Sequence, residues 1–116
     1  MAKNQRYTHN LHISVTAPRA VKSGDPVVVG AYAGVAKFDA KNGEKVTIWL
    51  DGSYLIPVEG AVTAYSLVYA KADGTLTATA TGNRPFGIAN EAKAGAPVAP
   101  VEVAPLGRLQ SVAAGA

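Results

Sequence analysis

Two histidines, His9 and His12, are the residues whose spacing would suit a metal ion. Side chains three residues apart share one face of a helix, and imidazoles on such a face can bind zinc. The chain is polar before residue 10 and alternates apolar and polar residues from Leu11 onward, which predicts an arm and a strand instead. No third ligand lies nearby in the sequence. We therefore expect structural or solvent-exposed histidines and predict no metal site.

The carboxylates do not form an acid–base pair in the sequence. Most lie in turn-like stretches, where Asp and Asn bond their own backbone. The chain has no Gly-x-Ser-x-Gly elbow, no Gly-x-x-x-x-Gly-Lys-Ser/Thr phosphate loop and no cysteine. We predict that the protein is not an enzyme and has neither catalytic residues nor a cofactor. The turn acids are Asp25, Asp39, Glu44, Asp51, Glu59 and Asp73.

Trp49 and Tyr54 are the aromatic pair that could contact a ligand or a partner. Asp51-Gly52 is a typical two-residue hairpin turn, which would join a strand at 46–50 to one at 53–58. That hairpin would place Trp49 opposite Tyr54, with large apolar groups on both of its faces. Burial in the core or between subunits is favoured over stacking on a sugar or a base.

The composition favours strands and a modest core. The chain has 116 residues, and its 48% hydrophobic content includes 22 alanines. Valine and threonine dominate the rest of the strand-like stretches. The net charge of +3 is scattered, so we predict no nucleic-acid binding. No apolar run approaches the roughly 20 residues of a membrane span, so we predict no membrane association.

Short apolar runs separated by turn signals predict an all-β fold, a small β-barrel or β-sandwich of antiparallel strands with an extended N-terminal arm. The arm is residues 1–10, the β domain residues 11–107 and the C-terminal tail residues 108–116. Leu11, Ile13 and Val15 are expected to point inward. The prolines Pro57 and Pro100 limit their strands to edge positions or bulges. The expected strands are 11–16, 26–29, 31–37, 46–50, 53–58, 65–71, 75–81, 86–89 and 98–103.

Two segments resemble each other within the chain. Gly34-Val35-Ala36 leads through a Lys/Gly turn to Val46-x-Ile48 and Asp51-Gly52. Gly87-Ile88-Ala89 leads through Lys93-Ala94-Gly95 to Val101-x-Val103 and Leu106-Gly107. The order of these motifs indicates two similar β-units, although a chain rich in Gly, Val and Ala also produces such likeness by chance.

The order of several motifs resembles that of the small capsid decoration, or cement, proteins of tailed bacteriophages. The first group is Ser23-Gly24-Asp25-Pro26-Val27-Val28-Val29-Gly30, then Gly34-Val35-Ala36, then Gly43-Glu44 before a Val-x-Ile strand. The second runs from Tyr69-Ala70-Lys71-Ala72-Asp73-Gly74 to Gly82-Asn83 and Phe86-Gly87-Ile88-Ala89. The likeness covers about residues 11–107.

This resemblance implies a structural protein on the outer surface of the mature phage head, assembled in the host cytoplasm. It also implies a homotrimer at three-fold and quasi-three-fold positions that binds the major capsid protein. An N-terminal arm of such a protein lies across the shell, so the resemblance points to the arm as the capsid-binding segment. The arm residues are Lys3, Asn4, Gln5, Arg6, Tyr7 and Thr8.

A small β-barrel that binds carbohydrate or nucleic acid is the alternative function. It predicts a monomer whose Trp49 fluorescence responds to the ligand, whereas a capsid protein would form oligomers and bind a preformed shell. Arg84 precedes Pro85, and we expect it to be a loop charge, which is favoured over a contact to an acidic capsid surface.

Overall fold

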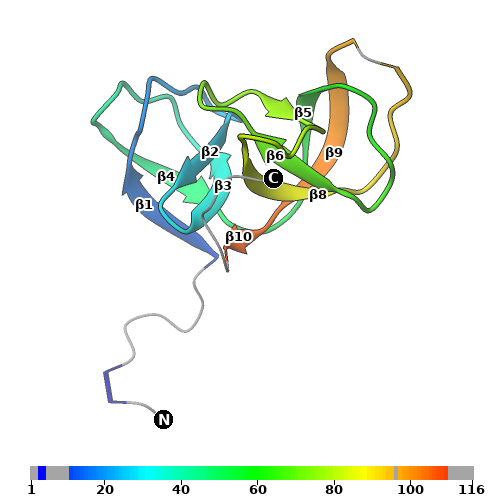
Figure 1. The fold of residues 1–116 in the computed structure, drawn as a ribbon. Coiled ribbons are helices and arrows are strands. Elements are labelled where there is room, and N and C mark those ends of the chain that lie inside the picture. Colours follow the sequence, from blue (N-terminus) through cyan, green and yellow to red (C-terminus); the bar gives the residue numbers. More distant parts are fainter. Residues whose placement is uncertain (1–2, 5–10, 96, 110–116) are drawn as a thin grey trace.

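The computed structural model describes residues 3–4, 11–95 and 97–109, and every regular element within these ranges is a β-strand (Figure 1). This confirms the predicted all-β class. No helix in the described part is long and apolar enough to cross a membrane. The strands are β1 His12–Thr16, β2 Pro26–Val29, β3 Tyr32–Ala36, β4 Lys45–Trp49, β5 Tyr54–Glu59, β6 Leu67–Ala70, β7 Leu76–Thr77, β8 Arg84–Ala89, β9 Ala99–Pro105 and β10 Gly107–Arg108.

The strands form two sheets that lie side by side (Figure 1). The first sheet has the order β1-β4-β3-β10, and β2 also pairs with β3. The second is a closed barrel of β5, β7, β6, β8 and β9. All pairs are antiparallel except β5–β7, a two-residue parallel pair that closes the barrel. The predicted barrel is thus present, with a second sheet packed beside it.

Each sheet has its own buried cluster. Alternate residues of β1 and β4, including Val15, Val46 and Ile48, form one cluster with Val27 and Ala36. The other fills the barrel, with Val58, Val68, Phe86 and Val101 among its members. Ala33 and Val35 of β3 belong to the barrel cluster, so the first sheet and the barrel share a core.

The two halves of the chain repeat one topology, as the internal likeness of the sequence indicated. The antiparallel series β1–β4–β3 corresponds to β5–β9–β8. An isolated bridge Val21↔Ala40 in the first half matches Val62↔Lys93 in the second. We call residues 11–50 the first half and residues 51–105 the second half. The hairpin turn that contains β7 is an insertion of the second half alone.

Gly34 and Gly87 occupy the same place in the two halves. A Cβ atom at Gly34 would overlap the carbonyl oxygen of Trp49, and one at Gly87 would lie 2.5 Å from the carbonyl oxygen of Ala104. Val35, which follows Gly34, pairs with Trp49, and Ile88, which follows Gly87, pairs with Ala104. The two glycines therefore allow β3 to approach β4 closely and β8 to approach β9 closely.

The predicted hairpin of 46–50 with 53–58 is wrong. β4 pairs with β1 and β3, whereas β5 pairs with β9 and β7. Trp49 lies opposite His12 and Val35, and Tyr54 lies opposite Val103. Asp51-Gly52 instead connects the first sheet to the barrel. Pairing β4 between two strands of its own half buries Val46 and Ile48, which an isolated hairpin would leave half covered.

Other details of the prediction are corrected by the structure. Leu11 precedes β1 and is 48% exposed, although Ile13 and Val15 do point inward. The strand expected at 75–81 is only Leu76–Thr77. The turn Lys41–Glu44 is closed by a bond from the Glu44 amide to the Lys41 carbonyl, 3.0 Å. Within this turn only Gly43 has a positive φ, 88°, which is the type II pattern and not the type I′ that Asn-Gly suggested.

The two strand prolines lie opposite each other. Pro57 of β5 pairs with Pro100 of β9. The second neighbour of β5 is β7, which pairs only with Val58 and Glu59. The second neighbour of β9 is β8, which pairs only with residues 103–105. Each proline thus has a partner strand on one side alone, as the missing N–H group requires.

Candidate interaction surfaces

The described residues hold no group of three or more His, Cys, Asp or Glu side chains that could bind a metal. His12 instead packs its ring against Trp49, with 5.1 Å between the ring centroids and 60° between the planes. His9 lies outside the described residues. The histidine pair therefore gives no site that the structure describes.

Trp49 is half-buried on β4, and the side chains of Lys37 and His12 contact its indole. The Lys37 ammonium group lies 5.1 Å from the centre of a Trp49 ring and 5.3 Å from the centre of the Phe38 ring. His12 covers another part of the indole. Cation–π attraction of this kind holds the lysine over the aromatic groups, so the exposed surface at Trp49 is both aromatic and basic.

Tyr54 lies in the other sheet, at the start of β5, and does not meet Trp49. Its hydroxyl group donates a hydrogen bond of 2.7 Å to the carbonyl oxygen of Asp51. Burial, and then the negative charge of Asp51, raise the pKa of the Tyr54 phenol above its usual value. Tyr54 therefore fastens the connection between the two halves, and the structure separates the two aromatic residues that sequence reasoning paired.

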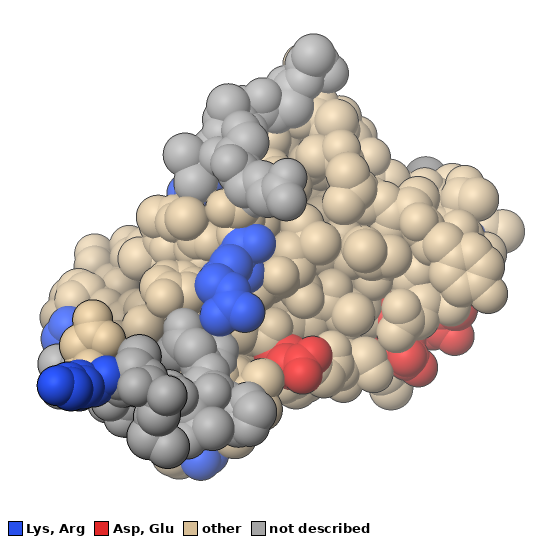
Figure 2. Space-filling model, turned by 90° about the horizontal axis from the view of Figure 1, so that it is seen from below, with Lys and Arg blue, Asp and Glu red and all other residues tan. Residues whose placement is uncertain are grey.

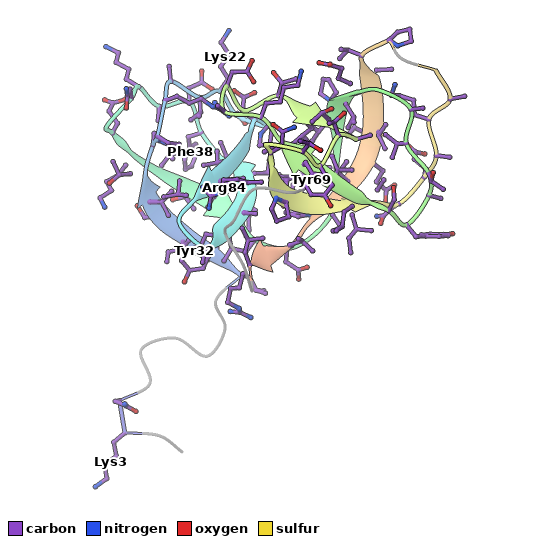
Figure 3. The ribbon with its side chains drawn as sticks, in the orientation of Figure 1. Lys3, Lys22, Tyr32, Phe38, Tyr69 and Arg84 are labelled. Atoms are coloured by element: carbon purple, nitrogen blue, oxygen red, sulfur yellow. The ribbon has the colours of Figure 1, made fainter. Side chains whose placement is uncertain are left out.

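Two arginines cross the junction between the first sheet and the barrel. Arg84 of β8 donates a hydrogen bond to the carbonyl oxygen of Gly30, in the β2–β3 turn of the first sheet (Figure 3). Arg19, which follows β1, donates to the carbonyl oxygen of Pro26 at 2.6 Å. Its guanidinium group fills the space over Gly74 in the β6–β7 turn, where a Cβ atom would overlap it.

A cavity of about 210 Å³ lies at this junction, lined by both arginines and by Lys71. Lys71 forms an ion pair of 2.5 Å with Glu59. The Nε atom of Arg84 is buried and has no hydrogen-bond partner within the described residues. Arg84 bonds to a carbonyl of the first half, and Arg19 of the first half packs over Gly74 of the second, so we interpret both arginines as clamps between the two halves.

The outer face of the barrel is apolar and exposed. It consists of the side chains that project away from the barrel core on β5, β6, β8 and β9. Leu55 is 72% exposed, Leu67 43% and Ile88 36%. Leu67 lies opposite Ile88, and Leu55 lies opposite Glu102. We call these residues, with Ala104, the outer barrel face.

Tyr65 extends this surface just before β6. It is 82% exposed, and it is the one described residue other than glycine with a positive φ, 69°. Its amide bonds to the carbonyl oxygen of Ala89 at 2.7 Å, which fixes it beside β8. A large side chain in a strained backbone on an open surface is a pattern found at functional sites.

The corresponding surface of the first sheet is polar and basic. Lys45, Thr47 and Trp49 share one face of β4, and they lie opposite Thr16, Ser14 and His12 of β1. Lys37 lies over Trp49 at the same edge. We call these seven residues the β1–β4 face.

The sequence reasoning did not identify the outer barrel face. A signal was present, because residues 65–71 carry large side chains at Tyr65, Leu67 and Tyr69 and also place Val68 and Ala70 on the opposite side. Of the predicted arm residues, Lys3 and Asn4 are described and exposed. Gln5, Arg6, Tyr7 and Thr8 lie outside the described residues.

Comparison with known proteins gives one family. The model of the family described as phage cement protein matches residues 5–105. No curated protein and no solved structure matches the chain.

Proposed function

Because the chain belongs to the phage cement protein family, which gives it a structural, capsid-associated role, we propose that it binds the outer surface of the mature head. There it stabilises the lattice of the major capsid protein as a homotrimer at three-fold and quasi-three-fold positions. The observation that carries the proposal is the family match over residues 5–105, which includes every strand from β1 to β9.

The form of the molecule is suited to such a role. A cement protein must contact several neighbours at once, and weak contacts become strong when linked subunits bind together. The described surface offers an apolar face on the barrel and a basic face on β1 and β4. Apolar patches of this kind on small proteins mark interaction sites.

The N-terminal arm, residues 1–10, is the proposed capsid-binding segment. Lys3 and Asn4 are exposed, and the arm is polar apart from Met1, Ala2 and Tyr7. A polar extended segment can add a strand to an exposed sheet edge through its backbone groups, with little demand on side-chain fit. The proposal is therefore that the arm pairs with a capsid sheet while the body sits above it.

The test is co-sedimentation with expanded heads of the parent phage that lack the protein. The full chain is compared with a truncated chain that begins at Leu11. We expect saturable binding of the full chain and weaker binding of the truncated one. A variant with Lys3 and Arg6 replaced by Ala is the matched control, because it keeps the backbone of the arm and removes only its charge.

Each result has one meaning. Equal binding of the full and truncated chains would keep the cement role and move the contact to the folded body. Absence of binding by the folded full chain would overturn the proposed role and favour a small barrel that binds another ligand.

A further inference from the structure

The outer barrel face and the β1–β4 face occupy equivalent positions in the two halves. The pair Ser14↔Thr47 in the first sheet corresponds to Leu55↔Glu102 in the barrel, because Val15↔Val46 corresponds to Ile56↔Val101. Trp49 corresponds in the same way to Ala104. The two surfaces therefore have equivalent strand pairing and differ in their side chains.

Their charges are opposite. The β1–β4 face has Lys45 on β4 and Lys37 over Trp49. The outer barrel face has Glu102 between its apolar residues, and the Glu91 carboxylate beside it accepts a hydrogen bond of 3.0 Å from the Glu102 amide. One face is thus basic and aromatic, and the other is acidic and aliphatic.

The same asymmetry holds for each half as a whole. Residues 11–50 contain five Lys or Arg and three Asp or Glu, whereas residues 51–105 contain three and five. On the surface seen in Figure 2, basic side chains lie at the left and centre, and acidic ones lie at the centre and toward the right, the side of the barrel. Copies of this chain would therefore attract one another when the barrel of one meets the first sheet of the next.

Burial differs at the matching positions of the neighbouring strands. Pro26 and Val35 in the first half are buried, whereas their counterparts Leu67 and Ile88 in the barrel are exposed. The first half is covered there by its own chain, since Val35 belongs to the barrel cluster. The barrel has no such cover among the described residues.

We propose that the outer barrel face of one copy packs on the β1–β4 face of the next copy, in a head-to-tail contact. Leu55, Leu67 and Ile88 would lie against Trp49 and the stems of Lys37 and Lys45, with Glu102 facing the lysines. Tyr65 would lie beside the contact, and its left-handed backbone conformation would hold the ring at that position. Such a heterologous contact joins two different surfaces, and it forms a closed ring when the rotation between copies closes.

The contact itself needs only the charges and the apolar face. The closure into three copies rests on the proposed function, in which the protein is a homotrimer. The two statements can be tested separately, because self-association is measured without capsids and capsid binding is measured without knowing the ring size.

The test reverses one charge on each face. Glu102→Lys and Lys45→Glu each place like charges across the contact, and like charges that face each other in an interface oppose association. In sedimentation velocity at low salt, we expect either change to weaken self-association by about tenfold or more. The double variant, Glu102→Lys with Lys45→Glu, restores opposite charges and should return association to near the wild-type level.

Lys22→Glu is the matched control, since it makes the same charge change on an exposed turn outside both faces. It should leave association unchanged. Thermal unfolding of each variant, followed by circular dichroism, separates a lost contact from a lost fold. Leu67→Ser tests the apolar part without changing charge and should also weaken association.

Three outcomes would overturn the contact: a wild-type chain that stays monomeric at high concentration, folded single reversals that associate normally, or a double variant that is no better than the single ones. Co-sedimentation of the same variants with heads distinguishes the two proposals. Normal association without head binding would leave the contact in place and remove the cement role. Head binding without self-association would support the cement role and overturn the contact between copies.

Discussion

Gly24 and Tyr65 occupy the same position in the two halves of the chain, and both have a positive φ. The angle is 91° at Gly24 and 69° at Tyr65. The Gly24 amide bonds to the carbonyl oxygen of Ala36 at 2.8 Å, and the Tyr65 amide bonds to that of Ala89 at 2.7 Å. Both halves therefore have a residue in the left-handed conformation at this turn. Only the first half has glycine there, which adopts this conformation without strain.

Replacing Tyr65 with Gly should stabilise the fold. Holding a non-glycine residue in the left-handed region costs roughly 1–2 kcal/mol, and the greater chain entropy that Gly loses on folding offsets part of the gain from removing this strain. We expect a net gain of about 0.5–1 kcal/mol in the free energy of unfolding, measured by urea denaturation. Tyr65→Ala is the control, because it keeps the Cβ atom and removes only the ring. An equal gain for the two variants would show that the ring, and not φ, is the source of strain.

Gly34→Ala and Gly87→Ala should each destabilise the protein, and the two losses should be similar in size. In both cases the new methyl group would press on a backbone carbonyl oxygen, which cannot move aside as a flexible side chain can. We expect each change to lower the free energy of unfolding by about 2–3 kcal/mol. Gly30→Ala is the comparison, since its φ is 55° but no atom lies within 4 Å of the added Cβ. If Gly30→Ala costs as much as the other two, crowding is not the reason for glycine at 34 and 87.

The sequence predicted the strands more accurately than their partners. Alternation placed Val15, Val46 and Ile48 inward, and the structure buries them together. The Asp51-Gly52 turn favoured a local hairpin, but the same two residues also suit a connection between sheets. Turn chemistry acts over a few residues, whereas the pairing of β4 with β1 depends on the core that the whole half forms.

The candidate surfaces were predictable only in part. Trp49 was correctly placed on a strand, although its expected neighbour Tyr54 lies in the other sheet. The exposure of Leu67 and Ile88 follows from which face of β6 and β8 the barrel core uses. A strand with apolar residues on both faces does not indicate which face turns inward, and so this surface needed the structure.

Removing the Arg19 side chain should loosen the β6–β7 turn. The Arg19 guanidinium group covers Gly74 and bonds to the Pro26 carbonyl, so it holds the turn against the first sheet. For Arg19→Ala we expect a loss of about 1–2 kcal/mol, the range for a hydrogen bond from a charged donor. Hydrogen exchange should then speed up at the Gly74 amide, which bonds to the Lys71 carbonyl at 2.9 Å. Arg84→Ala serves as the control, because Arg84 crosses the same junction to Gly30 and should leave the exchange of Gly74 unchanged.

Ionisation of Tyr54 should weaken the fold at alkaline pH. Burial and the Asp51 charge raise the pKa of the phenol in the folded state, so folding favours the neutral form. This contribution is fully present below the unfolded pKa of about 10 and is lost as the pH rises through the higher folded value. Tyr54→Phe lacks the titrating group, so its urea midpoint should fall less than that of the wild type between about pH 9 and pH 11. Tyr69→Phe, on another strand of the barrel, is the control, because it removes a different phenol hydroxyl group. If the wild type and Tyr54→Phe lose stability in parallel, ionisation of the Tyr54 phenol is not what weakens the fold in this pH range.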